Sequence, residues 1–195
     1  MNLPDAWLYD AVRTPRGRGK DNGSLYILRP IDLLVSALEG LRTRTHLPTQ
    51  NVDDVVIGCV TQTGEQGACI ARFAALQAGW DFDAPGVTLN RFCGSGLQAV
   101  VHATEGIRAG TTRLAVAGGA ESMSNAPYLL TQARWGYRMG NGEALDSLLS
   151  DGLTCAINAI HMGITAEEVA NRFGVSRQDQ DESKQAVHSE GKQRN

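Results

Sequence analysis

Along the first 120 positions, short apolar runs typical of strands alternate with segments whose apolar residues have helical spacing. Four short runs rich in apolar or β-branched residues predict strands at residues 6–12, 54–60, 86–91 and 112–118. Between them, residues 31–44, 67–78 and 95–109 carry apolar side chains at helical spacing and predict three helices. In the first helix the apolar side chains are Ile31, Leu34, Val35, Leu38 and Leu41, and in the third Leu97, Val100, Val101 and Ile107 share one face.

Strands that alternate with helices predict an α/β fold. Parallel neighbours are joined by right-handed crossovers, so we expect a mainly parallel sheet with helices on its faces. The strand segments are almost continuously apolar, as burial on both faces of such a sheet requires. Residues 6–12 are expected to be a short buried strand of this kind.

The pattern changes after Gly119. Residues 121–160 are irregular, with several glycines and polar residues, which is typical of a functional loop or of a separate excursion from the domain. Two helices are predicted beyond them: Thr165 and Glu168 form a capping box for residues 166–173, and Ser176 caps a polar helix from 177 to about 190. We therefore divide the chain into an α/β domain at 1–120 and the start of a loop domain at 121–195.

Composition narrows the classes of function. Hydrophobic residues make up 42% of the 195 positions and charged residues 20%, as in soluble globular proteins. The 18 basic and 21 acidic residues give a formal net charge of −3, and without a dense basic stripe we expect no nucleic-acid partner. The small basic cluster Arg13, Arg16, Arg18 and Lys20 is interpreted as a solvated loop.

The sequence shows no targeting signal and no disulfide-like or metal-like cysteine spacing, so we expect a cytoplasmic protein. No apolar run reaches the roughly 18 residues of a membrane helix, and the first ten residues lack the basic and apolar regions of a signal peptide. The cysteines show neither a CxxC nor a metal-ligand spacing, so free thiols and no metal site are expected. They are Cys59, Cys69, Cys93 and Cys155.

Cys93 is the candidate nucleophile. It lies between a predicted buried strand and an amphipathic helix, in the stretch Asn-Arg-Phe-Cys-Gly-Ser-Gly-Leu at 90–97. The positive end of a helix dipole favours the thiolate form, and the flanking glycines let a ligand approach the backbone. The Cys93 N–H could also face the oxyanion formed on an attacked carbonyl, so the context suits a residue that becomes acylated.

Two other interpretations of the same stretch remain open at this point. Cys93 could be a small apolar filler, as buried cysteines often are. Alternatively, Gly94, Gly96 and Ala99 fit a dinucleotide-binding fingerprint after a strand, with Glu121 as the acid that would bind a ribose. That alternative describes a dinucleotide-binding oxidoreductase.

Five segments together resemble one known family. LNRFCGSGLQAV at 89–100 resembles the acyl-enzyme signature of the thiolases. DAVRTPRGRG at 10–19, DDVVIGCV at 53–60 and AVAGGAESMSNAPY at 115–128 resemble further segments of that family, and HMGITAEEVANRFGVSRQDQD at 161–181 resembles its loop domain. The resemblance implies a layered thiolase-like α/β fold with an irregular loop-domain excursion.

The resemblance also implies an activity and a few site residues. A thiolase-type acyltransferase acts on acyl-CoA thioesters, by 3-ketoacyl-CoA thiolysis or acetoacetyl-CoA formation, with coenzyme A as substrate or product and no permanently bound cofactor. Cys93 matches the nucleophile, and Met162 with its neighbour His161 matches a substrate-binding segment. Glu121, Ser122 and Met123 match a motif near the active site to which no chemical step is assigned.

Motifs of the family's second half do not occur among these 195 residues. They are a Gly-His-Pro histidine, a Cys-Gly-Gly-Gly cysteine and an Asn-Glu-Ala-Phe segment. His102 lies too far along the helix after Cys93 to be its base, and His46 and His188 are interpreted as surface residues. We expect a fragment or one half of a split enzyme that turns over poorly alone, or a non-catalytic module that forms homo-oligomers or binds a separate C-terminal-half chain.

Overall fold

The computed structural model describes residues 4–193, with side chains as far as Ala186. These residues form two compact units, which divide between Gly152 and Leu153. The division predicted after residue 120 concerns a family-type loop domain and stays a prediction.

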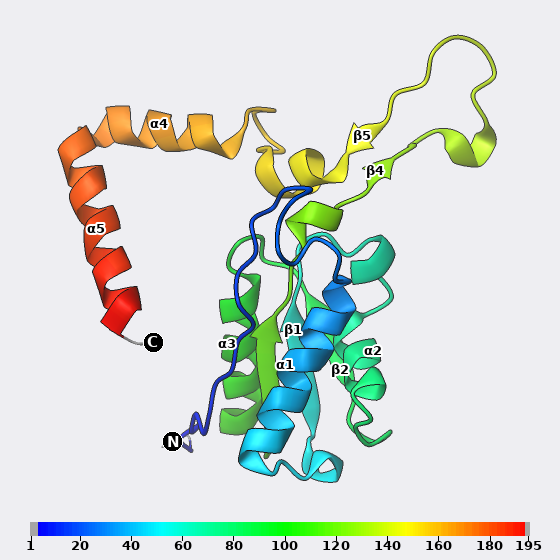
Figure 1. Cartoon of the computed structure of the whole chain (residues 1–195), viewed down its shortest axis with the longest axis vertical. Coiled ribbons are helices and arrows are strands. Elements are labelled where there is room, and N and C mark those ends of the chain that lie inside the picture. Colours follow the sequence, from blue (N-terminus) through cyan, green and yellow to red (C-terminus); the bar gives the residue numbers. More distant parts are fainter. Residues whose placement is uncertain (1–3, 194–195) are drawn as a thin grey trace. The chain divides into compact units, whose positions relative to one another are not determined.

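A three-stranded parallel sheet forms the centre of the first unit (Figure 1). Its strands are β1 (Asp54–Gly58), β2 (Gly86–Leu89) and β3 (Ala115–Gly119). The order is β2–β1–β3, with Val56 of β1 opposite Val87 and Ala117. β1 is therefore the central strand, and both of its neighbours come later in the chain. The predicted parallel α/β arrangement is confirmed.

Three helices connect and cover these strands. They are α1 (Pro30–Thr45), α2 (Ile70–Gln77) and α3 (Ser95–Ala109), close to the predicted bounds. Pro30 occupies the first turn of α1, where its missing N–H costs no hydrogen bond. Gly110 ends α3 in the left-handed conformation, with φ of +77°, which glycine adopts without strain.

The two faces of β1 meet different helices. Val55, Ile57 and Cys59 belong to one buried cluster with residues of α1 and α2. The members of that cluster from these two helices are Leu34, Leu38, Ile70, Ala71, Ala74 and Ala75. Gly58, which alternates with them, faces α3 instead. The sheet is thus covered on both sides, which accounts for its unbroken apolar strands.

α3 packs unusually close to the sheet. A Cβ built on Gly58 would lie 2.3 Å from the carbonyl carbon of Ser95 in the first turn of α3. Only small side chains fit on the face of α3 that approaches so closely, and the buried residues of the helix are Ser95, Ala99 and Ala103. Large apolar residues expected to share one face of the helix are exposed in this unit. They include Leu97, Val100 and Val101.

An ion pair fixes the amino ends of β1 and β3. Asp53 accepts hydrogen bonds from the backbone N–H groups of Arg113 and Leu114, at 2.7 and 3.2 Å, and a third from the Arg113 guanidinium at 3.2 Å. These donors lower the pKa of the Asp53 carboxyl to about 2. The amino ends of β1 and β3 are therefore held together by a carboxylate that stays ionised.

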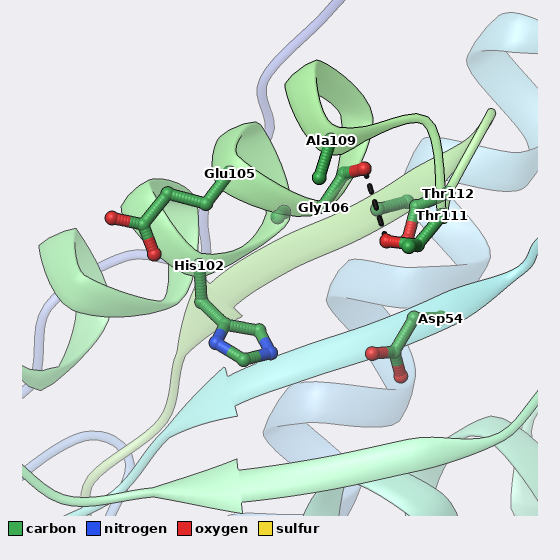
Figure 2. A pocket seen from close by; sticks show the side chains of 9 residues that line it. Asp54, His102, Glu105, Gly106, Ala109, Thr111 and Thr112 are labelled. Carbon is green, nitrogen blue, oxygen red and sulfur yellow. Dashed lines mark hydrogen bonds between the residues drawn. The ribbon is translucent and has the colours of Figure 1, made fainter.

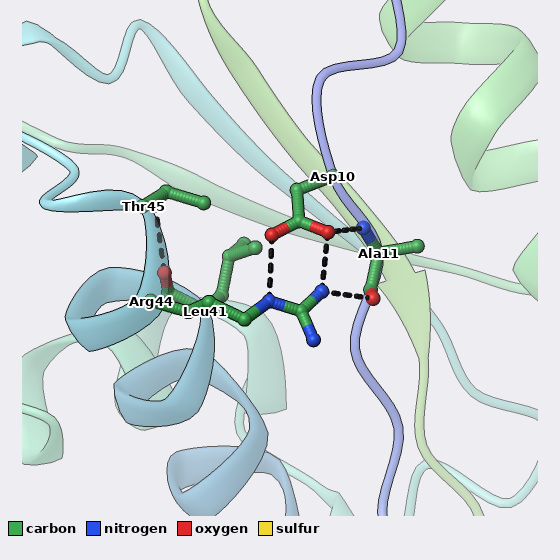
Figure 3. A network of polar contacts seen from close by, with 5 residues as sticks. All are labelled: Asp10, Ala11, Leu41, Arg44 and Thr45. Atoms are coloured by element: carbon green, nitrogen blue, oxygen red, sulfur yellow. Dashed lines mark hydrogen bonds and ion pairs between the residues drawn. The ribbon is translucent and has the colours of Figure 1, made fainter.

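Residues 6–12 do not form the predicted buried strand. They are extended but unpaired, and Trp7, Leu8 and Tyr9 are exposed. An apolar run becomes a strand only if a neighbour supplies backbone hydrogen bonds, and none of the three strands pairs with these residues. Arg44 of α1 binds the segment through the Asp10 carboxylate and, at 2.6 Å, the Ala11 carbonyl (Figure 3).

The segment that follows β3 is irregular, as predicted. Its elements are short: two 3-10 turns at Met123–Asn125 and Ala133–Trp135, the antiparallel pair β4 (Tyr128–Leu129) and β5 (Leu145–Asp146), and a π-helical segment at Leu148–Leu153. Ser147 is the fully buried residue of this region, and its hydroxyl donates to the Pro127 carbonyl at 2.6 Å.

The second unit consists mainly of α4 (Met162–Phe173) and α5 (Arg177–Gln193). α4 begins earlier than predicted, because His161 caps it: Nδ1 accepts a hydrogen bond from the Gly163 N–H at 3.0 Å. The predicted cap at Thr165 is therefore wrong. The Ser176 cap of α5 is confirmed, with the Asp179 N–H donating to its hydroxyl at 3.2 Å. No helix among residues 4–193 is long and apolar enough to cross a membrane.

Candidate functional site

Three loops meet at one edge of the parallel sheet. Residues 59–61 follow β1, residues 90–94 follow β2 and residues 120–122 follow β3. Since all three strands are parallel, these loops lie together at the carboxyl edge, where α/β proteins place ligands. Cys93 is in the second of them.

The segment Asn90–Ser95, called here the Cys93 turn, joins β2 to α3. The Gly94 N–H donates to the Arg91 carbonyl at 3.1 Å, and the Ser95 N–H donates to the Phe92 carbonyl at 2.9 Å. Cys93 therefore comes two residues before the first residue of a 15-residue helix. Its position beside a helix N-terminus was predicted and is confirmed.

The Cys93 turn contains a strained residue. Phe92 has a φ of +48°, in the left-handed region that side chains larger than glycine rarely adopt. Two side chains hold it there: the Asn90 carbonyl oxygen accepts from the Phe92 N–H at 2.8 Å, and the buried Ser95 hydroxyl donates to the Phe92 carbonyl at 2.6 Å. Ser95 also accepts from the Arg91 N–H at 2.8 Å. The backbone around Cys93 is thus fixed by its neighbours.

The Cys93 side chain is exposed. This excludes the interpretation of Cys93 as a buried apolar filler. An accessible thiol in the turn before a helix can be reached by an electrophilic substrate, as a nucleophile must be. All four cysteines are free thiols, as expected.

Glu121 occupies the centre of the same edge. Its carboxylate accepts from the Val60 N–H at 2.7 Å, from the Thr61 N–H at 3.3 Å and from the Gln66 side-chain amide at 2.9 Å. The carboxylate is thus bound by protein donors, which argues against its predicted alternative role of binding a ribose. The buried Gln66 completes the cluster, since its carbonyl oxygen accepts from the Ser122 N–H at 2.5 Å.

Cys59 lies buried beside this cluster, in contrast to Cys93. Burial, followed by the negative charge of Glu121, raises the pKa of the Cys59 thiol to about 12. A thiol with such a pKa is not a nucleophile at neutral pH. The two cysteines at this edge are therefore distinguished by their surroundings.

The histidines of the first unit lie away from the Cys93 turn. His102 is exposed on α3, where it lines a shallow groove of about 440 Å³ with Asp54, Glu105 and Thr112 (Figure 2). Asp54 is the first residue of β1, so the groove extends toward the sheet edge opposite Cys93. His46 is the exposed C-cap of α1. The surface position predicted for His46 is confirmed, and His102 lies on α3 beyond the Cys93 turn, as its spacing predicted.

The other predicted site residues belong to the second unit. His161 caps α4, and Met162 is its first residue, with 44% of its surface exposed. Cys155 lies in a turn before them, where the Asn158 and Ile157 N–H groups lower the pKa of its thiol. The His188 side chain lies outside the described residues. Among the described residues, no cluster of histidine, cysteine and acidic side chains could hold a metal ion.

Sequence reasoning missed Asn90 and Ser95, which shape the Cys93 turn, and Gln66, which binds Glu121. Asn90 directly follows a strand and precedes a turn. In this setting an asparagine side chain commonly accepts a hydrogen bond from the backbone N–H two positions later. This signal was present for Asn90. Nothing in the sequence marked Gln66, which lies 55 positions before Glu121.

Comparison with known proteins agrees with this geometry. Residues 7–195 match the family model described as thiolase, N-terminal domain. The chain belongs to the thiolase family. It is 45% identical over 186 residues to the acetyl-CoA acetyltransferase of Escherichia coli K12, covering 95% of this chain and 46% of that protein. It is 42% identical to beta-ketothiolase BktB of Cupriavidus necator, covering 87% of this chain and 43% of the relative.

A solved thiolase structure shows the same fold. The crystal structure of the Bacillus anthracis acetyl-CoA acetyltransferase superposes with a TM-score of 0.76 at 38% identity, covering 82% of this chain and 40% of that one. The thiolase-like α/β fold inferred from the resemblance is thereby confirmed. The chain spans about half the length of the curated relatives it matches.

Proposed function

We propose that this thiolase-family chain carries the acyl-accepting half of an acyltransferase that acts on acyl-CoA thioesters, with Cys93 as the acylated residue. The observation that carries the proposal is the exposed Cys93 thiol at the start of α3, in a strained turn that side-chain hydrogen bonds hold in place. Relatives named acetyl-CoA acetyltransferase support the substrate class. Coenzyme A is then a substrate or product, and no permanently bound cofactor is required.

The proposed acylation step uses this geometry. The Cys93 thiolate attacks the carbonyl carbon of acetyl-CoA, and the Cys93 N–H and the first turn of α3 face the oxyanion that forms. The tetrahedral intermediate collapses as the bond from carbon to the coenzyme A sulfur breaks. Coenzyme A leaves as a thiolate and takes a proton from water, and acetyl-Cys93 remains.

Thiolysis of a 3-ketoacyl-CoA adds a second requirement. Attack at the keto carbon breaks the bond between the second and third carbons, so acetyl-CoA departs with the electron pair and must receive a proton from an acid. The described first unit offers no imidazole beside Cys93. We therefore propose that the 195-residue polypeptide alone is acylated but turns over poorly.

His161 and Met162 are proposed to contact the substrate. Both are exposed at the start of α4, and their segment matches one that lines the acyl and pantetheine channel in the family. Exposed Leu97, Val100 and Val101 on α3 support association with a second copy or with a chain carrying the C-terminal half. Light scattering with and without such a chain tests this, and a strictly monomeric species in both samples contradicts it. We place the protein in the cytoplasm.

Peptide mass spectrometry tests the central proposal. After incubation with acetyl-CoA, the peptide that contains Cys93 should gain one acetyl group, and the Cys93→Ala variant should gain none there. Cys69 provides the matched control, because it is also an exposed free thiol at a helix start. Equal acetylation of both cysteines would mean non-specific chemistry, and an unmodified Cys93 in a folded chain would overturn the proposal.

A further inference from the structure

We infer that Glu121 is a positioning residue for Cys93, acting across the sheet edge through the Val60 peptide and Asn90. The inference rests on the proposed role of Cys93. The thiol and the Glu121 carboxylate belong to different loops, which follow β2 and β3, and the loop after β1 connects them.

The first link joins Glu121 to the loop after β1. Both carboxylate oxygens are used: one accepts from the Val60 N–H at 2.7 Å, and the other from the Thr61 N–H at 3.3 Å. The chain next to Glu121 is fixed to the same strand, because the Ala120 N–H donates to the Gly58 carbonyl at 3.0 Å. The Thr61 N–H and the Val60 carbonyl belong to the same peptide group, called here the Val60 peptide, so Glu121 sets the direction of that carbonyl relative to the sheet.

The second link joins Val60 to the Cys93 turn. The Val60 carbonyl accepts from the Asn90 side-chain amide at 3.2 Å, while the carbonyl oxygen of that amide accepts from the Phe92 N–H at 2.8 Å. The Asn90 amide therefore bridges the two loops. Its donor side depends on where the Val60 carbonyl points, and its acceptor side holds Phe92 at its positive φ.

Only a carboxylate satisfies the first link. Its neighbours at this point, two backbone N–H groups and the Gln66 amide nitrogen, are all donors. An amide in place of the carboxylate would turn its own N–H₂ toward at least one of them, and two donors repel. The Val60 peptide would then reorient, Asn90 would lose its donor contact, and Phe92 would be free to leave the strained conformation that places Cys93.

Two substitutions test the two links, with a matched control. Glu121→Gln removes the charge at the first link. Asn90→Asp keeps an acceptor for the Phe92 N–H but removes the donor to Val60. Glu105→Gln makes the same chemical change as the first variant on exposed α3, away from the three loops.

The readout is the rate of Cys93 acetylation at several concentrations of acetyl-CoA. We expect each of the first two variants to lower the maximal rate about tenfold without changing the half-saturating concentration, since Glu121 and Asn90 align the nucleophile and do not contact substrate. The double variant should lose about as much as either single variant, because both act through one peptide group. Glu105→Gln should match the wild type, and circular dichroism should give all variants the same folded signal.

Amide hydrogen exchange at Phe92 supplies a readout that needs no acyl-CoA. It should be about tenfold faster in Glu121→Gln, because the Asn90 acceptor is no longer held in place. Wild-type exchange in Glu121→Gln, or losses that multiply in the double variant, overturns the inference. If the wild type is never acetylated, the proposed function fails, and the exchange measurement still decides whether Glu121 positions the turn.

Discussion

Replacing Gly58 by alanine is the most direct test of the close contact between β1 and α3. The added Cβ would lie 2.3 Å from the Ser95 carbonyl carbon, 2.5 Å from its oxygen and 2.6 Å from the Gly96 nitrogen. All three atoms belong to the backbone, so no side chain can rotate away. Restoring an ordinary contact of 3.4 Å requires α3 to withdraw by about 1 Å.

The expected cost follows from this displacement. Overpacking a core costs up to about 3 kcal/mol, and we expect Gly58→Ala to reach that limit because a whole helix must move. For a domain of this size the loss corresponds to a fall in Tm of roughly 6 to 12 °C. The withdrawal also shifts the first turn of α3, and a misplacement of about 1 Å at a nucleophile lowers its rate by up to about a hundredfold.

Gly118→Ala is the matched control. Gly118 lies in β3, and a Cβ built there meets no atom within 4 Å. Its effect on the free energy of unfolding should stay within about 1 kcal/mol. Thermal unfolding followed by circular dichroism measures both variants, together with Cys93 acetylation. A Gly58→Ala protein that melts with the wild type and is acetylated at the same rate would refute the packing argument.

Three further predictions concern other parts of the first unit. Asp53→Asn should lower the free energy of unfolding at pH 7, measured by urea unfolding. The difference from the wild type should disappear as the pH falls from about 4 to about 2, because the Asp53 carboxyl, whose pKa is lowered in the folded state, stabilises the fold only while it is ionised. Cys59 should resist iodoacetamide at pH 8 until the protein is unfolded, and rapid alkylation of the native protein would contradict its burial. Because the pKa of the Cys59 thiol is raised in the folded state, the free energy of unfolding should decline as the pH rises from about 9 toward 12. Gly40→Ala, in α1 with no atom within 4 Å of the new Cβ, should raise the free energy of unfolding by about 0.5 to 1 kcal/mol, seen as a higher urea midpoint.

The sequence predicted those elements whose signals are local. α1 and α3 begin and end where Pro30, Gly110 and the helical spacing indicate, and β1 is formed by the apolar run at 54–58. The position of Cys93 at a helix start was also predicted, because a strand, a cysteine and two glycines lie within eleven positions, at 86–96. These features depend on residues within a few positions of one another.

What sequence reasoning missed depends on residues far apart in the chain. The run at Trp7, Leu8 and Tyr9 has strand composition, but a strand also needs a neighbour that pairs with it, and the residues of the run do not determine whether one will. In α3 the larger apolar residues suggested the packing face, whereas the glycine on β1 decides that small residues are buried. The bonds of Glu121 reach 55 to 61 positions back, so no spacing rule reveals them.

The place of β1 at the centre of the sheet has a consequence for synthesis on the ribosome. Both strands that pair with it are translated afterwards, and the second ends only at Gly119. At about 5 to 20 residues per second, roughly 3 to 12 seconds separate the appearance of Gly58 from that of Gly119. During this interval the Val-Val-Ile run of β1 has at least one unpaired edge, which leaves the nascent polypeptide open to pairing with other chains until β3 has been made.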